Sequence, residues 1–393
     1  MFVTPLFKLM SEKQASDIFF TAGAPIQIKI NGVVMPINSQ ALNPEQVKNI
    51  CYELMNQGQI AEFEAKHEMN FARRGEGDGN AALGNFRINI FKQRNTVGMV
   101  IRFVKPDVPA FDTLGLPTIL KEVIMEKLGL ILVVGSTGSG KSTTMASMID
   151  HRNATRSGHI LTIEDPIEFA FRHKKSIVNQ REVRVDTLSY HEALISAMRE
   201  APDLIMIGEI REQSTLVSAL LFAQTGHLCM STLHANNSYN ALNRIINFFP
   251  RDQRDALLSD ISIALRAVIS QRLIRTQDGR RIPAVEVLLN TKHIQELIKA
   301  GDMSQIKEAM EQSLSPGSQT FEQALFNLIH EGKISVDEAM VNSDSPTNLH
   351  WLLNNASKPV SSAKAAPQAA PGGRPQVAAD DISNIKLNLD ALG

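Results

Sequence analysis

Residues 130–143 read LILVVGSTGSGKST, an apolar run followed at once by a glycine-rich turn. The turn matches the spacing G-x-x-x-x-G-K-[ST], with Gly135, Gly140, Lys141 and Ser142 at the fixed positions. Glycines let such a loop curl so that its backbone N–H groups point inward at phosphate oxygens. A helix that begins near Gly140 adds the positive end of its dipole. The segment STTMASMIDH that follows reads as that helix, so this stretch predicts a strand, a phosphate-binding loop and a helix.

The loop predicts a site for ATP with Mg²⁺. Lys141 would reach the β- and γ-phosphates, and the Ser142 hydroxyl would ligate the metal ion. A chance match in a glycine-rich turn is the alternative, but the strand before the loop and the helix after it are the context that a working loop needs. The residues predicted to bind the nucleotide are Gly135, Ser136, Thr137, Gly138, Ser139, Gly140, Lys141, Ser142 and Thr143.

Carboxylates follow two apolar strand segments farther along the chain, LTIEDPIEF (residues 161–169) and APDLIMIGEIRE (residues 201–212). Ligands of parallel α/β sheets bind outside the carboxyl ends of the strands. Hydrolysis needs an acid that organises the metal ion and a carboxylate that orients or deprotonates water. We therefore expect catalytic roles for Glu209 and Glu168 and metal binding by Asp165. An Asp before a proline also suits a turn, and this alternative stays open for Asp165.

Two histidines bracket the next apolar segment, TGHLCMSTLHANN (residues 225–237). His227 and His234 are seven residues apart, which is no standard spacing of zinc ligands, and no cysteine cluster accompanies them. A lone histidine is most often structural. These two belong to the strand unit after Glu209, where a sensor of the γ-phosphate is expected, so we predict catalytic roles for both.

Residues 1–105 read as a small α+β domain. Asn31-Gly32 supplies hairpin turn chemistry between two alternating segments, and Pro44 opens a helical stretch. The expected strands are Ile26–Ile30, Val33–Ile37, Asn85–Phe91 and Val97–Val104, and the expected helix is Pro44–Met55. Residues 106–114 read as a linker, because their prolines resist both a helix and a central strand.

From about residue 115, strands alternate with segments of helical length. A helix over Leu116–Leu128 precedes the loop strand, and apolar strands recur at His159–Ile163, Leu204–Ile207 and Leu228–Ser231. Such alternation predicts an α/β fold, a mostly parallel sheet with helices on its faces. After about residue 290 the pattern is helical to about Asn355, and we assign the domain to residues 115–357.

Residues 358–393 read as a tail. The stretch Lys358–Ala379 is rich in Ala, Pro, Ser and Gly, so it cannot bury a core and is expected to be disordered. The final segment, DISNIKLNLDALG, places Ile382, Ile385, Leu389 and Leu392 on one helical face. A frayed end and a tethered docking peptide both fit this pattern.

Bulk composition limits the class of protein. With 43% hydrophobic and 21% charged residues the chain is typical of a soluble globular protein, and a net charge of -1 gives no basic field for nucleic acid. The two cysteines, Cys51 and Cys229, cannot build a disulfide framework. The first twenty residues lack the features of a signal peptide, and Leu128–Val134 is too short to span a membrane. We predict a cytoplasmic protein that neither crosses a membrane nor binds nucleic acid.

Together the motifs resemble those of the secretion-type ATPases over residues 1–355. GSTGSGKST is similar to the Walker A loop of that family, LTIEDPIEF to its aspartate box, PDLIMIGEIR to its atypical Walker B motif and TGHLCMSTLHANN to its histidine box. The four-cysteine metal motif and extra N-terminal domain of the assembly and secretion members are missing, which favours the branch that retracts type IV pili. Residues 293–302 read HIQELIKAGD where the PilT-type group typically has AIRNLIREGK. With the long tail, the chain therefore looks more like the accessory, PilU-type group.

The resemblance implies a hexameric ring whose ATP hydrolysis drives pilus retraction and twitching motility. Each subunit would have a PAS-like N-terminal domain and a RecA-like core with ATP between them. Force would pass to an inner-membrane platform protein, which would hold the ring at that membrane, and a paralogous retraction ATPase is the other implied partner.

The resemblance also implies that Arg87 and Arg102 act as arginine fingers, because family members carry arginines at matching positions. Alternation agrees, since Phe86, Ile88 and Ile90 would face inward and both arginines would share the polar face. A solvated strand face is the alternative.

Three other functions stay open. The chain could be a pilus assembly or type II secretion ATPase, a nucleic-acid translocase on the same core, or a largely structural partner of an active paralogue. The near-neutral charge argues against the translocase. The lack of an LSGGQ-like segment argues against an ABC-type ATPase.

Overall fold

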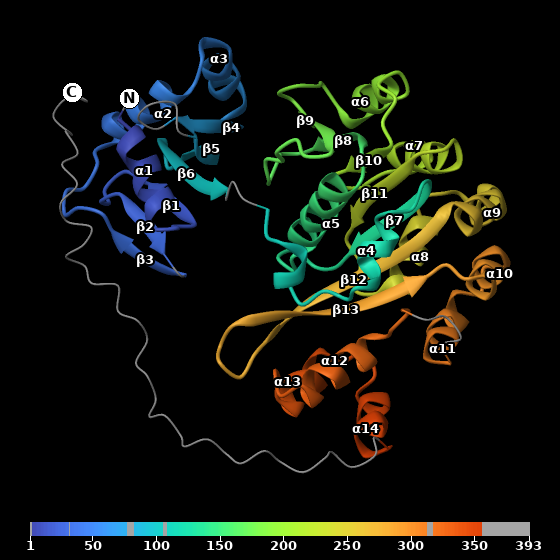
Figure 1. Ribbon diagram of the computed structural model, residues 1–393. Coiled ribbons are helices and arrows are strands. Elements are labelled where there is room, and N and C mark those ends of the chain that lie inside the picture. The colour runs from blue at the N-terminus through green and yellow to red at the C-terminus, as the bar shows by residue number, and fades with distance from the viewer. Residues whose placement is uncertain (1, 31, 77–81, 105–107, 313–316, 356–393) are drawn as a thin grey trace. The chain divides into compact units, whose positions relative to one another are not determined.

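The chain divides after Asp107 into two compact units, which we call the N-terminal unit and the C-terminal unit. The computed structural model describes residues 2–30, 32–76, 82–104, 108–312 and 317–355 (Figure 1). The predicted tail, residues 358–393, lies outside the described residues. Among the residues described, no helix has the length and apolar character that crossing a membrane requires.

The N-terminal unit is built on a six-stranded antiparallel sheet with the order β3-β2-β1-β6-β5-β4. The strands are β1 (Asp17–Phe20), β2 (Gln27–Ile30), β3 (Val33–Pro36), β4 (Glu68–Glu76), β5 (Ala82–Gln93) and β6 (Thr96–Val104). The helices are α1 (Thr4–Glu12), α2 (Pro44–Leu54) and α3 (Gln57–Lys66). The predicted helix after Pro44 and the four predicted strands are confirmed, while β1 and β4 were not foreseen.

Alternation on β5 builds the core of this unit. Phe86, Ile88 and Ile90 are each at most 1% exposed, as predicted from their spacing. Phe7 of α1 stacks on Phe86 with 4.1 Å between ring centroids, and Phe103 of β6 packs at 5.2 Å. Helix α1 is therefore fixed to the sheet by an aromatic cluster.

The C-terminal unit contains a seven-stranded sheet with the order β13-β12-β7-β11-β10-β8-β9. The strands are β7 (Gly129–Val134), β8 (Gly158–Glu164), β9 (Ser176–Glu182), β10 (Leu204–Ile207), β11 (Leu228–Leu233), β12 (Leu265–Arg275) and β13 (Arg281–Leu289). All neighbouring strands are parallel except β12 and β13, which form a hairpin. The mostly parallel sheet and the four predicted strands are confirmed, whereas β9, β12 and β13 were not foreseen.

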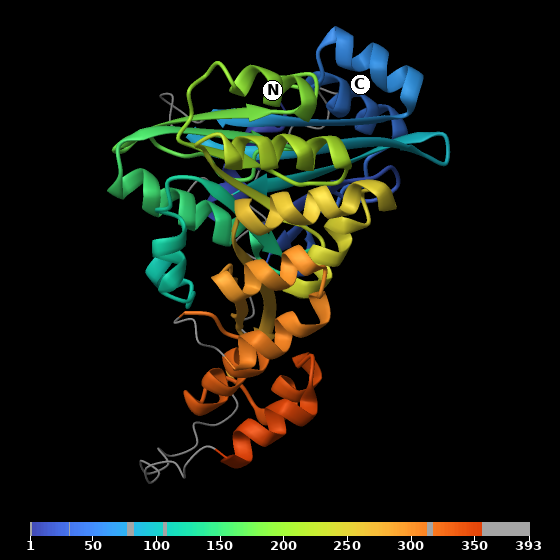
Figure 2. The same cartoon turned by 90° about the vertical axis from the view of Figure 1, so that its right-hand side faces the viewer.

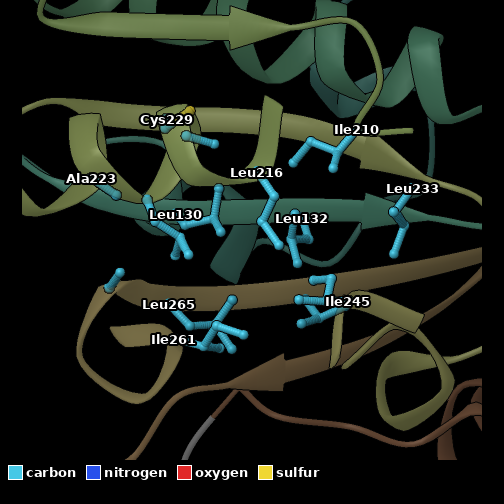
Figure 3. Packing of buried hydrophobic residues seen from close by; sticks show 14 of the residues in the cluster. Leu130, Leu132, Ile210, Leu216, Ala223, Cys229, Leu233, Ile245, Ile261 and Leu265 are labelled. Atoms are coloured by element: carbon cyan, nitrogen blue, oxygen red, sulfur yellow. The ribbon is translucent and has the colours of Figure 1, made fainter. Parts of the chain in front are cut away.

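Helices cover both faces of this sheet, because successive side chains of a buried strand point to opposite sides. On one face Leu130 and Leu132 of β7 meet α7, α8 and α9 in a continuous apolar cluster (Figure 3). On the other face Ile131 and Val133 pack with α4 and α5. The helices up to α9 are α4 (Ile119–Val123), α5 (Lys141–Thr155), α6 (Tyr190–Ala197), α7 (Gln213–Gln224), α8 (Ser238–Ile246) and α9 (Arg254–Ala264).

The last part of the unit is helical, as predicted. It comprises α10 (Lys292–Ala300), α11 (Ile306–Glu311), α12 (Phe321–His330), α13 (Val336–Asn342) and α14 (Pro346–Asn355). Helices α12 to α14 form a separate apolar cluster with Ile274 and Ala284 of the β12–β13 hairpin. Figure 2 shows these orange-red helices at the opposite end of the unit from the green strands β8 and β9.

The helix predicted over Leu116–Leu128 is wrong in length, because only Ile119–Val123 is α-helical. The fully buried Arg152 donates hydrogen bonds to the carbonyl oxygens of Ile124 and Glu126. After Val123 the amides of Met125 and Glu126 donate to the carbonyl oxygens three residues back, of Glu122 and Val123, so the chain turns more tightly than an α-helix and the helix ends. The side chain of Arg152 on α5 therefore holds the turn that follows the helix.

Phe86→Ala should destabilise the N-terminal unit by about 3–5 kcal/mol, because it removes a buried ring and leaves a cavity beside Phe7 and Phe103. Denaturant unfolding followed by circular dichroism should show a lower midpoint. Val34→Ala is the matched control, since Val34 is 50% exposed on β3 and its truncation should change stability by less than about 0.5 kcal/mol. Equal midpoints for the two variants would contradict this account of the core.

Candidate functional site

The phosphate-binding loop lies between the end of β7 at Val134 and the start of α5 at Lys141. Gly140 has φ +89°, and a Cβ there would lie 2.7 Å from Gln271 Nε2. A Cβ on Gly135 would lie 2.4 Å from Ser139 Oγ and 2.6 Å from the Gln271 carbonyl oxygen. Both positions therefore require glycine, and the predicted strand, loop and helix are confirmed.

Lys141 lies against the loop that precedes it. Its ammonium donates to the carbonyl oxygens of Gly135 at 2.9 Å and Ser136 at 2.8 Å. Burial lowers the pKa of Lys141, and the negative charges of Glu209 and Glu168 oppose that shift. The lysine is therefore a buried cation, 9% exposed, whose charged form both predicted catalytic carboxylates favour.

Gln271 of β12 holds the loop from the side and was missed in the sequence. Its Oε1 accepts a hydrogen bond from Thr144 Oγ1 at 2.7 Å, and its Nε2 donates to the Ser139 carbonyl oxygen at 2.7 Å. The side chain is 3% exposed. It therefore ties the loop to the first turn of α5. The one sequence signal was a run of three polar residues, Ser270 to Arg272, between apolar residues of β12.

Glu209 follows β10, and β11 fixes the backbone on both sides of it. Thr232 Oγ1 donates to the Gly208 carbonyl oxygen at 2.6 Å, and the Ile210 amide donates to the Thr232 carbonyl oxygen at 3.0 Å. Because one residue of the neighbouring strand engages both flanks, the Glu209 side chain leaves the sheet edge in a set direction.

The structure brings Glu209 and His234 together, as the sequence predicted for this edge of the sheet. His234 Nε2 lies 3.3 Å from Glu209 Oε1, and Arg211 Nε donates to Glu209 Oε2 at 2.8 Å. Each oxygen of the carboxylate therefore has its own partner. The Glu209 side chain is only 17% exposed, which strengthens these interactions relative to open solvent.

The aspartate-box segment follows β8 at the same edge. Glu164 is 7% exposed and accepts hydrogen bonds from Thr162 Oγ1 at 2.7 Å and Gln180 Nε2 at 3.1 Å. Burial raises the pKa of Glu164 to about 7, although those two hydrogen bonds act in the opposite direction. Asp165, the predicted metal ligand, forms an ion pair with Arg184. Glu168 lies half-buried three residues farther on.

His227 is not brought to this edge. It precedes β11, whereas His234 follows it, so the two lie about 20 Å apart at opposite ends of a six-residue strand. His227 packs edge-on against Phe222 of α7, with 5.5 Å between ring centroids, and its carbonyl oxygen accepts from the Gly129 amide at the start of β7. Within this unit the predicted catalytic role of His227 has no geometric support, and packing accounts for the side chain.

Arg87 and Arg102 are directly paired across β5 and β6, so they share one face of the N-terminal sheet, as alternation predicted. Arg102 Nε donates to Asp17 Oδ1 at 2.8 Å, and the Asp17 side chain is 7% exposed. The predicted action of both arginines on bound phosphates stays a prediction.

The chain is similar to ATPases of bacterial secretion and type IV pilus systems along most of its length. A family model described as "Type II/IV secretion system protein" matches residues 1–341. The chain is 45% identical to the type IV pilus ATPase PilU of Pseudomonas aeruginosa, over 90% of this chain and 91% of that protein. It is 39% identical to the PilT retraction ATPase of the same organism, over 88% of this chain and all of that protein. A crystal structure of the pilus retraction motor PilT with bound ADP is similar with a TM-score of 0.82, 40% identity and coverage of 89% of this chain and 99% of that one.

Gln271→Leu should weaken ADP binding by roughly tenfold, because it removes two hydrogen bonds that hold the loop and each contributes about 0.5–1.5 kcal/mol. Titration calorimetry with ADP measures the effect. Gln277→Leu is the matched control, since Gln277 is an exposed glutamine in the turn of the same hairpin and should leave the affinity unchanged. Equal ADP affinities for the two variants would show that the hydrogen bonds of Gln271 do not contribute to ADP binding.

Glu164→Gln should change how stability depends on pH. An acid whose pKa is raised in the folded state binds its proton more tightly there than in the unfolded chain. The wild type should therefore lose stability as pH rises from about 4.5 to about 7, by up to roughly 3 kcal/mol. The amide of the variant would keep the size and the acceptor oxygen without the titration. Thermal unfolding across this range should show a steeper decline for the wild type, and parallel curves would contradict the assignment.

Proposed function

The chain belongs to the family of type II/IV secretion system proteins, and we propose that it is the ATP-hydrolysing motor of type IV pilus retraction. The observation that carries this proposal is the 45% identity with PilU across nearly the whole of both chains. The protein is an ATPase by this relationship, and twitching motility is the process it serves. The segment HIQELIKAGD (residues 293–302) favours the accessory, PilU-type role over the PilT-type role.

The finer architecture is also a proposal. We infer a PAS-like domain over residues 1–105, a linker over 106–114 and a RecA-like core over 115–357. The six-stranded antiparallel sheet supports the first assignment. The mostly parallel sheet, with a phosphate-binding loop directly after β7, supports the last.

The edge of the C-terminal sheet supports hydrolysis of ATP. The backbone N–H groups of Gly135–Thr143 would bind the phosphates, and Lys141 would exchange the carbonyl oxygens of its own loop for phosphate oxygens. Ser139 Oγ is buried without a hydrogen-bond partner among the described residues, so it too fits an oxygen-rich ligand. An anion there would offset the desolvation of the buried Lys141 cation.

Glu209 is the general base in this proposal. Its carboxylate would accept a proton from the attacking water, while His234 and Arg211 hold the two oxygens and His234 senses the γ-phosphate. Glu168 would contribute a second carboxylate beside Lys141. The catalytic role of His227 stays a prediction from the sequence, made from its place in the strand unit after Glu209.

Mg²⁺ fits the oxygen donors present at this edge. No group of three His, Cys, Asp or Glu in the described part of the chain could hold a metal ion alone. This suits an ion that shares its ligands with the phosphates, and Ser142 and Asp165 are the proposed protein ligands. Mg²⁺ would neutralise charge on the β- and γ-phosphates.

Assembly and partners follow from the same resemblance. We propose a homo-hexamer in which Arg87 and Arg102 place positive charge on the phosphates. It would lie at the inner membrane through a pilus platform protein and act with a paralogous retraction ATPase. A second candidate function is that of a largely structural partner of that paralogue. It stays open because the chain is 45% identical to PilU and 39% identical to PilT.

Mg²⁺-dependent ATP turnover of the purified chain tests the proposal. Lys141→Ala should abolish turnover through loss of phosphate binding, and Glu209→Gln should lower kcat by roughly 10²- to 10⁴-fold through loss of the base. Turnover per subunit should rise with protein concentration if the site completes on assembly.

Glu212→Gln provides the matched control, because Glu212 is an exposed acid three residues beyond Glu209 and bonds to Ser214. A wild type no faster than Lys141→Ala at every concentration would refute the autonomous motor. Addition of the paralogue would then test the structural role.

A further inference from the structure

Arg272 is the residue after Gln271 on β12, and it turns to the opposite face of the strand. There its guanidinium joins segments far apart in the sequence. Nη2 donates to the Asn236 carbonyl oxygen at 3.1 Å, and Nη1 donates to the Asn342 carbonyl oxygen at the end of α13. The same group forms an ion pair with Asp344 and stacks 4.0 Å from the centre of the Phe321 ring.

Asp344 reaches the same loop from the C-terminal side. Asn237 Nδ2 donates to Asp344 Oδ2 at 2.8 Å, and Asn237 Oδ1 accepts from the Asn240 amide at 3.0 Å to cap α8. Asn237 is 2% exposed. The loop of residues 234–237, which we call the His234 loop, is therefore held by β11 at its start and by Arg272 and Asp344 at its end.

The neighbours of Asp344 are themselves fixed by a buried acid. Glu322 of α12 is 1% exposed and accepts hydrogen bonds from Ser343 Oγ at 3.2 Å and the Ser345 amide at 2.7 Å. Lys307 Nζ lies 3.3 Å from the same carboxylate oxygen. Asp344 thus occupies a pre-organised position between two anchored residues.

His234 depends on its loop for its place beside Glu209. Its side chain is 40% exposed, so packing covers only part of the ring, and the course of the His234 loop determines whether Nε2 comes within 3.3 Å of Glu209. Two charged side chains hold the end of this loop: Arg272 comes from β12 of the core, and Asp344 comes from the turn between α13 and α14.

We propose that the Arg272–Asp344 pair positions His234 beside Glu209, so that the helical segment α12–α14 acts on the rate of ATP hydrolysis through this loop. The inference rests on the proposed function and deepens it. Arg272 and Asp344 are positioning residues that hold the loop carrying His234. Gln271, the neighbour of Arg272, holds the phosphate-binding loop instead.

Asp344→Asn tests the proposal in the full chain. The amide keeps the size of the side chain and one acceptor for Asn237 but loses the charge that pairs with Arg272. We expect kcat for ATP to fall by about tenfold, because a displacement of about 1 Å at a reacting centre can cost up to about 100-fold. KM for ATP and the affinity for ADP should stay at the wild-type values, since the phosphate-binding loop is held by Gln271.

Asp278→Asn is the matched control. Asp278 also forms an ion pair with an arginine, Arg280, but this pair is exposed at the tip of the same β12–β13 hairpin. Its loss should leave kcat unchanged. Arg272→Lys is the second variant, because lysine keeps the charge but loses the fork that reaches Asn236 and Asn342. It should also lower kcat with ADP affinity retained.

A double-mutant cycle with His234→Ala decides whether the pair acts through the histidine. Asp344→Asn should add no further loss of kcat once His234 is absent. Losses that multiply would overturn the proposal, as would a loss of ADP affinity and melting temperature in parallel with kcat. If the wild type hydrolyses ATP and Asp344→Asn equals Asp278→Asn, the inference fails alone. If the wild type is no faster than Lys141→Ala, the proposed function fails and takes the inference with it.

Discussion

The close approach of β12 to the phosphate-binding loop is the constraint on which the site depends. Strands β12 and β7 pair in parallel up to Ser270 on β12 and Val134 on β7. Gln271 follows Ser270, and Gly135 follows Val134. At this separation the Gln271 carbonyl oxygen leaves no room for a Cβ on Gly135, and its amide leaves none on Gly140. The loop can curl around an anion only because both residues lack side chains, and its curled form is then held by the same glutamine.

The charges at the sheet edge follow from this geometry. A loop that directs N–H groups inward turns some carbonyl oxygens toward Lys141, which binds them while it is buried. The cation is buried, which lowers its pKa, and the negative charges of Glu209 and Glu168 oppose that shift. Glu209 in turn is held between His234 and Arg211. Loop, lysine, acid and histidine therefore form one electrostatic unit whose members come from the ends of three neighbouring parallel strands.

Those parts of the site that follow the chain order of a parallel sheet could be predicted from sequence. Gly135–Thr143, Glu209 and His234 each come directly after an apolar strand, and parallel strands end at one edge, so their meeting required no knowledge of distant contacts. His227 shows the limit of that reasoning, because it lies before its strand rather than after it. Gln271 and the Arg272–Asp344 pair could not be found this way, because their partners lie 127 and 72 residues away and no local pattern encodes the contact. The end of the helix at Val123 could not be predicted from the local pattern either, because the turn that follows it is held by the side chain of Arg152 on α5.

For Arg102 of the N-terminal sheet, contact with a bound phosphate would affect an ion pair that it already forms. Asp17 is almost fully buried, and Arg102 is its partner at 2.8 Å. If Arg102 moved away to a phosphate, a buried carboxylate would lose its counter-charge, and breaking one side of such a pair costs about 3–5 kcal/mol when the charge is fully buried. The Arg102 side chain is 61% exposed, so solvent would offset part of that cost for the arginine but not for Asp17. An arginine that reaches phosphate while still bonded to Asp17 through Nε avoids the penalty, because the guanidinium has further donors on its outer edge. Asp17 would then orient Arg102 in the way that Arg211 and His234 orient Glu209, with the donor and acceptor roles reversed.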